Sequence, residues 1–167
     1  FMQINTRHFG LIDVDENGIV DFPEGVPGFP DAKKFILLGS GDGDSPFKWL
    51  QSVDRPELAF AVADPFMIKK DYEINLDDDV LSMLDIEEPG DVLVYSIVVI
   101  PEDITKMSMN LKAPVVINIR KKKGAQVVLD TDMYGVRHYI MDELREREVV
   151  EDACADKKKR PVHCNRR

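Results

Sequence analysis

Residues 13–24, DVDENGIVDFPE, match the calcium-loop pattern D-x-[DN]-x-[DN]-G-x₅-E at every specified position. The pattern positions are filled by Asp13, Asp15, Asn17, Gly18 and Glu24. In an EF-hand such a loop joins two helices, whereas between two strands the same letters would form a turn. The residues on either side of this stretch therefore decide between a helical and a β fold.

Neither flank of this stretch suits a helix. Residues 4–12, INTRHFGLI, contain β-branched residues and a glycine, a composition typical of a strand. Residues 25–30, GVPGFP, hold two glycines and two prolines, and no exit helix can continue through them. The sequence therefore predicts a β-hairpin rather than a calcium site, with residues 16–18 as a three-residue loop.

The hairpin prediction includes a register and a conformation for Gly18. An Asn-Gly pair between alternating apolar residues is a strong hairpin signal, and Gly18 would take the left-handed conformation of a G1 bulge. In this register Val14 pairs with Val20 and Ile12 with Phe22 on the face toward the core. Asp13, Asp15 and Asp21 lie on the opposite, solvent-exposed face. Those three aspartates would bind a divalent ion weakly at most, so no metal site is expected.

Most of the remaining chain also alternates with a period of two, which is typical of strands. Expected strands cover residues 2–9, 35–38, 46–52, 58–63, 91–100, 113–119 and 125–129, separated by Gly- and Pro-containing turns. Asp77 is expected to cap a short helix. Residues 141–155 are expected to form a terminal helix. These patterns predict an all-β protein, a compact β-barrel-like (split-barrel-like) domain with one or two short helices.

The charge distribution separates a body from a tail. Residues 151–167 hold six Lys/Arg and three Asp/Glu, so the other 150 residues hold 16 basic and 28 acidic groups, a net charge of −12. Such a body repels nucleic-acid phosphates and attracts basic proteins. We therefore expect a single domain over residues 2–150, a flexible basic tail over 151–167, and no direct binding of nucleic acid.

Other sequence signals argue against catalysis, membrane insertion and export. No set of nucleophile, base and orienting group can be assembled, so no catalytic residue and no cofactor are predicted. No apolar run is long enough to span a membrane and the N-terminal residues lack a signal peptide, so a cytoplasmic protein is expected. Cys154, His163 and Cys164 do not have the spacing of a structural zinc site, and a reduced, exposed cysteine pair is expected instead.

Six segments follow one another along the chain: IVDFPEGVPGF (residues 19–29), SPFKWLQS (45–52), LAFAVADPF (58–66), NLKAPVVIN (110–118), QVVL (126–129) and YGVRHYI (134–140). In this order they resemble the FliW family of bacterial flagellar assembly factors. The resemblance covers about residues 2–145 and implies a β-barrel-like fold without enzymatic activity. Within these motifs, the residues expected in turns and core are Phe22, Pro23, Gly25, Pro27, Gly28, Trp49 and Pro65.

The resemblance also implies two protein partners. FliW-like proteins bind flagellin and, when free of it, bind CsrA, a small basic RNA-binding regulator that blocks translation of flagellin message. Binding antagonises CsrA allosterically, from outside its RNA groove, and relieves the repression. The acidic body suits such a basic partner, and a monomer is expected.

The candidate partner-binding residues come from residues 64–79, which combine acids, an aromatic and apolar residues expected to be exposed. The six chosen on that basis are Asp71, Tyr72, Glu73, Asp77, Asp78 and Asp79. An alternative from another class is a flavin-binding split-barrel enzyme. Against it, the body shows no basic cluster placed to hold a phosphate, because residues 121–123 are expected in a hairpin turn.

Overall fold

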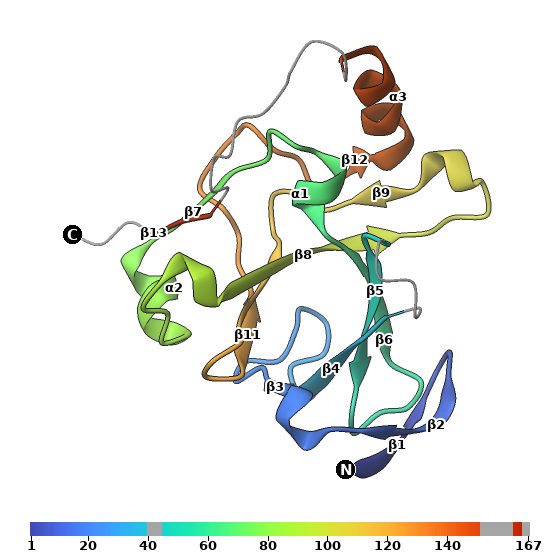
Figure 1. Cartoon of the computed structure of the whole chain (residues 1–167), viewed down its shortest axis with the longest axis vertical. Helices are drawn as coiled ribbons and strands as arrows, with labels where there is room; N and C mark the ends of the chain where they lie inside the picture. Colours follow the sequence, from blue (N-terminus) through green and yellow to red (C-terminus); the bar gives the residue numbers. More distant parts are fainter. Residues whose placement is uncertain (40–44, 151–161, 165–167) are drawn as a thin grey trace.

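Seven strands close into a barrel in the computed structural model, which describes residues 1–39, 45–150 and 162–164 (Figure 1). The barrel strands are β3 (Ile19–Asp21), β4 (Lys34–Gly39), β5 (Phe47–Ser52), β6 (Ala59–Ala63), β8 (Val92–Val99), β10 (Val115–Asn118) and β11 (Lys123–Gln126). They follow the order β10-β11-β3-β4-β5-β6-β8, and β8 pairs back with β10. The predicted all-β, barrel-like class is confirmed.

The position of strand β8 in the sheet explains why its sequence is mostly apolar. It pairs with β6, β9 and β10, so it lies inside the sheet. Val94 and Val98 face one hydrophobic cluster, whereas Tyr95 on the opposite face packs in another. Because β8 separates two cores, both of its faces carry mainly apolar side chains, and its serine, Ser96, is itself buried.

One core fills the barrel and includes the edge-to-face rings of Phe22 and Phe35, 5.1 Å apart. A larger core lies outside the barrel, against β8, β10 and β11. It is covered by short elements: α1 (Pro65–Ile68), β7 (Ile74–Leu76), α2 (Asp78–Met83), β9 (Ser108–Met109) and β12 (His138–Tyr139). Three 3₁₀ turns lie at Glu16–Gly18 (η1), Pro89–Asp91 (η2) and Ile104–Lys106 (η3).

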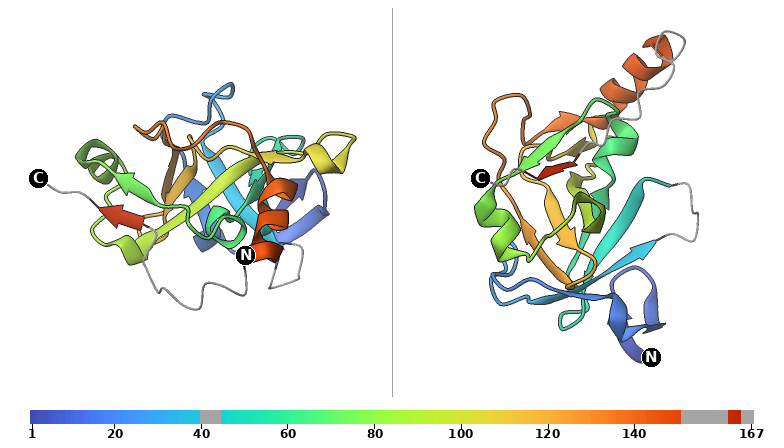
Figure 2. Two further views of the ribbon diagram at one scale, coloured as in Figure 1. Left: turned by 90° about the horizontal axis from the view of Figure 1, so that it is seen from above. Right: turned by 60° about the vertical axis from the view of Figure 1, so that its left-hand side comes forward.

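Helix α3 (Ile140–Val150) projects from the body, as the second view in Figure 2 shows. It begins one residue before the predicted start, and the predicted residues 151–155 lie outside the part of the chain that the structure describes. None of the described helices is both long and apolar enough to cross a membrane.

The predicted hairpin between residues 12–14 and 20–22 is wrong. Strand β2 (Gly10–Val14) pairs instead with β1 (Met2–Thr6), in the register Met2↔Val14 to Thr6↔Gly10, and β3 pairs with β4 and β11. The carboxylate of Asp15 accepts a 2.9 Å hydrogen bond from the N–H of Asn17 and caps the η1 turn. This turn sends the chain from a separate two-stranded hairpin into the barrel, and Gly18 does not have the positive φ of a G1 bulge.

The predicted burial in this stretch is largely confirmed even though the pairing is wrong. Val14, Val20 and Phe22 are buried and Ile12 is half-buried, whereas Asp13, Asp15 and Asp21 are exposed. The residues that the structure describes contain no group of three or more His, Cys, Asp or Glu that could hold a metal ion. The stretch that matches the calcium-loop pattern therefore consists mainly of strand residues and a 3₁₀ turn, and no helix flanks it within the described residues 1–39.

Three residues of the predicted tail form a strand. Strand β13 (Val162–Cys164) pairs in parallel with β7, in the register Val162↔Ile74 to Cys164↔Leu76. Residues 151–161 and 165–167, including Cys154, lie outside the described residues. The flexibility of the tail as a whole, and the redox state of its cysteines, stay predictions.

Candidate partner-binding surface

Side chains from Asp71 to Asp77 alternate between solvent and core. Tyr72, Ile74 and Leu76 are buried in the outer core, with relative exposures of 0%, 1% and 0%. Between them Asp71, Asn75 and Asp77 are exposed and Glu73 is half-buried. Because side chains of an extended chain point to opposite faces in turn, the buried set aims the carboxylates outward.

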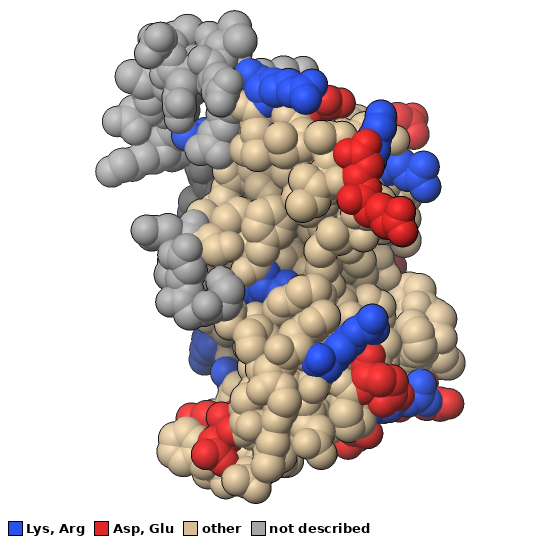
Figure 3. Space-filling view, turned by 90° about the vertical axis from the view of Figure 1, so that its right-hand side faces the viewer, with Lys and Arg blue, Asp and Glu red and all other residues tan. Residues whose placement is uncertain are grey.

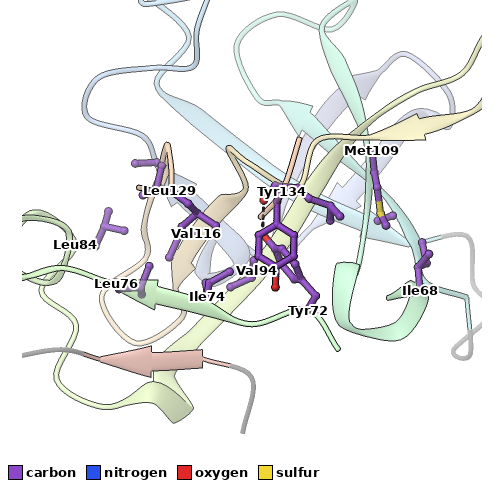
Figure 4. Packing of buried hydrophobic residues seen from close by; sticks show 14 of the residues in the cluster. Ile68, Tyr72, Ile74, Leu76, Leu84, Val94, Met109, Val116, Leu129 and Tyr134 are labelled. Atoms are coloured by element: carbon purple, nitrogen blue, oxygen red, sulfur yellow. Dashed lines mark hydrogen bonds between the residues drawn. The ribbon is translucent and has the colours of Figure 1, made fainter. Parts of the chain in front are cut away.

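Tyr72 anchors this segment and is not part of its surface. Its hydroxyl donates a 2.6 Å hydrogen bond to the backbone carbonyl of Leu111, and its ring packs edge-to-face on Tyr134 at 4.6 Å (Figure 4). The hydroxyl of Tyr134 accepts a 3.1 Å hydrogen bond from the N–H of Glu73. Burial raises the pKa of Tyr72, so its phenol stays a hydrogen-bond donor. The exposure predicted for Tyr72 is therefore wrong: it positions the neighbouring acids.

Both short helices that flank β7 are capped by aspartates. Asp77 accepts a 3.0 Å hydrogen bond from the N–H of Val80 and caps α2, as predicted. Asp78 and Asp79 lie exposed in the first turn of this helix, where negative charge is favourable. Asp64 caps α1 by accepting from Phe66 and Met67, although burial still raises its pKa.

Residues 71–91, which we term the acidic segment, carry nine Asp/Glu and no Lys, Arg or His. Cations from elsewhere pair with some of them. Lys69 lies 2.9 Å from Asp71, and Lys123 lies 2.6 Å from Asp85 and lowers the pKa of that carboxyl. Arg120 reaches the carboxylates of Glu87 and Asp91 at 3.6 and 3.5 Å. Because three cations cannot neutralise nine carboxylates, the acidic segment keeps a net negative charge.

Lys69 is held by acids on two sides. Its ammonium also lies 3.6 Å from Glu143 of α3, which in turn contacts His138 at 2.9 Å. Burial by itself would lower the pKa of Lys69, but its hydrogen bond to Asp71 and the charges of Asp71 and Glu143 outweigh burial and raise it. This ion pair network joins α3 to the start of the acidic segment.

A cleft of ≈ 150 Å³ lies beside β7. Asp71 and Glu73 line it together with Asp130, and Tyr134 forms part of its wall. The structure therefore brings two of the predicted site residues to one cleft. Asp77, Asp78 and Asp79 do not line this cleft but follow directly at the end of β7.

A second surface, which the sequence did not predict, is apolar. A hollow of ≈ 350 Å³ is lined mainly by Phe47, Trp49, Ile100, Ile104 and Met107. On the side of the molecule drawn in Figure 3, a broad uncharged area separates groups of charged residues. Ile100 and Ile104 are 51% and 63% exposed, which no alternation or spacing in the sequence would have revealed. A further groove of ≈ 340 Å³ runs between η1 and the end of β10.

The basic residues 121–123 lie where the sequence predicted them. The turn between β10 and β11 runs through Lys121 and Lys122, whose φ is 56°, and Lys123 begins β11. Lys123 is engaged with Asp85, as described above. Chemically, the described surface offers exposed carboxylates before β7 and at the start of α2, beside a small cleft. Such an arrangement suits a basic protein partner.

Comparison with known proteins gives one consistent result. The profile of the family described as "FliW protein" matches residues 3–140. A flagellar assembly factor FliW of Ruminiclostridium cellulolyticum is 54% identical over 148 residues, covering 89% of this chain and 100% of the relative. One from Caldanaerobacter subterraneus subsp. tengcongensis is 43% identical, covering 86% and 96%. A crystal structure of a flagellar assembly factor FliW superposes with a TM-score of 0.77 at 39% identity, covering 83% of this chain and 96% of that one.

Proposed function

The chain belongs to the FliW family of flagellar assembly factors, and we propose that it acts by binding flagellin and CsrA rather than by catalysis. In this proposal flagellin occupies the protein while flagellin is abundant in the cytoplasm. Once flagellin has been exported, the free protein binds CsrA outside its RNA groove. Repression of flagellin translation is then relieved.

The acidic segment is the observation that carries the CsrA part of this proposal. It carries nine carboxylates within 21 residues, in the stretches of chain directly before and after strand β7. Complementary potential speeds the encounter with a basic partner and fixes its orientation. Negative charge held next to a bound RNA-binding protein would also repel RNA phosphates.

Within this segment we assign partner contact to Asp71, Glu73, Asp77, Asp78 and Asp79. Tyr72 supports them from the core, because its ring and hydroxyl fix the chain on which Asp71 and Glu73 stand. Asp77 has a second role as the cap of α2, so its loss would disturb the helix as well as the surface. The clearest surface probes are therefore Asp71 and Asp79.

Equilibrium titration of CsrA and flagellin against a double variant tests the proposal. Asp71→Lys with Asp79→Lys changes the charge by +4 without touching a residue of the buried anchor. Asp13→Lys with Asp21→Lys makes the same change on exposed residues of β2 and β3, outside the acidic segment. We expect the first pair to weaken CsrA binding about tenfold or more and the second to change it less than threefold. Equal effects of the two pairs, or no binding of CsrA by the unaltered chain, would exclude this site.

A further inference from the structure

Strand β7 depends on β13 for its pairing. Among the described strands, β7 pairs with β13 alone, through Val162↔Ile74, His163↔Asn75 and Cys164↔Leu76. The side chains of Ile74 and Leu76 also hold β7 on the outer core, through packing among residues that all precede β13. Without β13, an immobile strand would therefore present an unpaired edge to solvent.

Strand β13 lies against the acidic segment, and the sequence on both sides of β13 is basic. Besides β7, β13 contacts the η2 turn (Pro89–Asp91), and both of these elements belong to the acidic segment. The views agree on this placement: β13 lies beside β7 in Figures 1, 2 and 4. Residues 157–167, which include β13, carry six Lys/Arg and no acid, against nine acids and no base in residues 71–91.

The body of the family ends before β13. The FliW family profile stops at residue 140, and 148 residues of this chain align with the whole of the relative from Ruminiclostridium cellulolyticum. The barrel and the outer core, including β7, all lie within the matched residues 3–140. The edge of β7 thus belongs to the shared body, whereas its present occupant comes from the tail.

We propose that the edge of β7 is a strand-addition site for an extended basic segment, and that this chain's own residues 162–164 occupy it as a displaceable intramolecular competitor. Main-chain hydrogen bonds supply affinity in such a site, and surrounding charge selects the basic occupant. A three-residue strand forms few hydrogen bonds, and exposed ion pairs are weak and screened by salt. A tethered segment still competes strongly, because tethering raises its effective concentration above that of a free peptide.

The inference goes beyond the proposed function, since both the site and its occupant belong to this chain. Its test uses a fluorescent peptide of residues 156–167 and needs neither flagellin nor CsrA. Failure of either protein to bind would leave the peptide result unchanged. A failed peptide experiment would in turn leave the proposed partners untouched.

The peptide is titrated against the full chain and against the full-length variant V162P/H163P. The two prolines remove the N–H groups at both alternating positions of β13, so its own strand cannot pair as before. We expect the peptide to bind the variant at least about tenfold more tightly than the unaltered chain. In hydrogen exchange, the amides of residues 74–76 should exchange faster in the variant and be protected again by the peptide.

A peptide carrying the same two prolines is the matched control, because it keeps all six basic residues. It should bind the variant at least about tenfold more weakly than the native peptide. Equal binding of both peptides would overturn strand addition and leave charge attraction alone. Equal binding of the native peptide to the full chain and the variant, or binding to neither, would overturn the competition.

Discussion

The hydroxyl of Tyr72 donates a 2.6 Å hydrogen bond to the backbone carbonyl of Leu111, and neither residue has any solvent exposure. The bond joins two segments that lie 39 residues apart in the chain, the start of the acidic segment and the loop after β9. Tyr72, which the sequence suggested as a contact residue at the surface, thus lies in the core and supports the neighbouring acidic residues from within. The acidic surface is fixed by the core beneath it.

Replacing Tyr72 with Phe should lower the free energy of unfolding by about 1–3 kcal/mol. The ring packing would remain, but the buried carbonyl of Leu111 would lose the hydroxyl that donates to it, which is more costly than losing an exposed hydrogen bond. Urea denaturation measures the change, and Tyr139→Phe is the control because Tyr139 is 36% exposed. Equal stability of the two variants would show that the Tyr72 hydroxyl contributes nothing.

Asp64→Asn should leave stability at neutral pH unchanged or raise it, whereas Asp64→Ala should cost about 1 kcal/mol. Asparagine keeps the oxygen that caps α1 and removes the charge whose burial raises the pKa of Asp64. With that pKa raised, the folded state binds the proton more tightly than the unfolded state. Stability contributed by this group is therefore greatest at low pH and falls as pH rises from the ordinary value of 3.8 through the raised one.

Chemical denaturation of the Asp64 variants between pH 3 and pH 7 checks this sign, over roughly the range in which carboxylates titrate. Relative to the asparagine variant, the unaltered protein should lose stability as pH rises through that window. A larger loss in Asp64→Asn than in Asp64→Ala would contradict the assigned cause.

Gly25 and Gly28 form a matched pair for testing close backbone approach. Both have positive φ, 67° and 89°, so alanine is strained at each. A Cβ on Gly25 would also lie 2.5 Å from the carbonyl oxygen of Phe29, whereas a Cβ on Gly28 meets nothing within 4 Å. Gly28→Ala should cost about 1–2 kcal/mol and Gly25→Ala about 2 kcal/mol more, measured by thermal unfolding. Equal costs would mean that the turn of residues 25–29 relaxes freely.

Period-two alternation made most strands of the barrel predictable. The same pattern was present in residues 71–77, where Tyr72, Ile74 and Leu76 recur at every second position. Interpreted as a strand, residues 71–77 would be expected to bury Tyr72 and to expose the acids. The error came from judging the segment by composition rather than by period.

Strand pairing was harder to predict than strand position. The Asn-Gly signal favoured a hairpin between β2 and β3, but local turn chemistry does not determine which strand completes each edge. In the structure β2 pairs with β1, and β3 joins β4 and β11, so Val14 and Val20 enter different cores. The pairing of β13 with β7 is likewise a long-range contact that no local pattern encodes.

The association rate of CsrA as a function of ionic strength tests most directly that the acidic segment recruits a basic partner. The unaltered chain and the D13K/D21K control should show a steep fall in rate as salt increases, and D71K/D79K should start slower and respond less. This result would identify the acidic segment as the source of the attraction. A rate independent of salt, or an equal loss in both variants, would contradict the account.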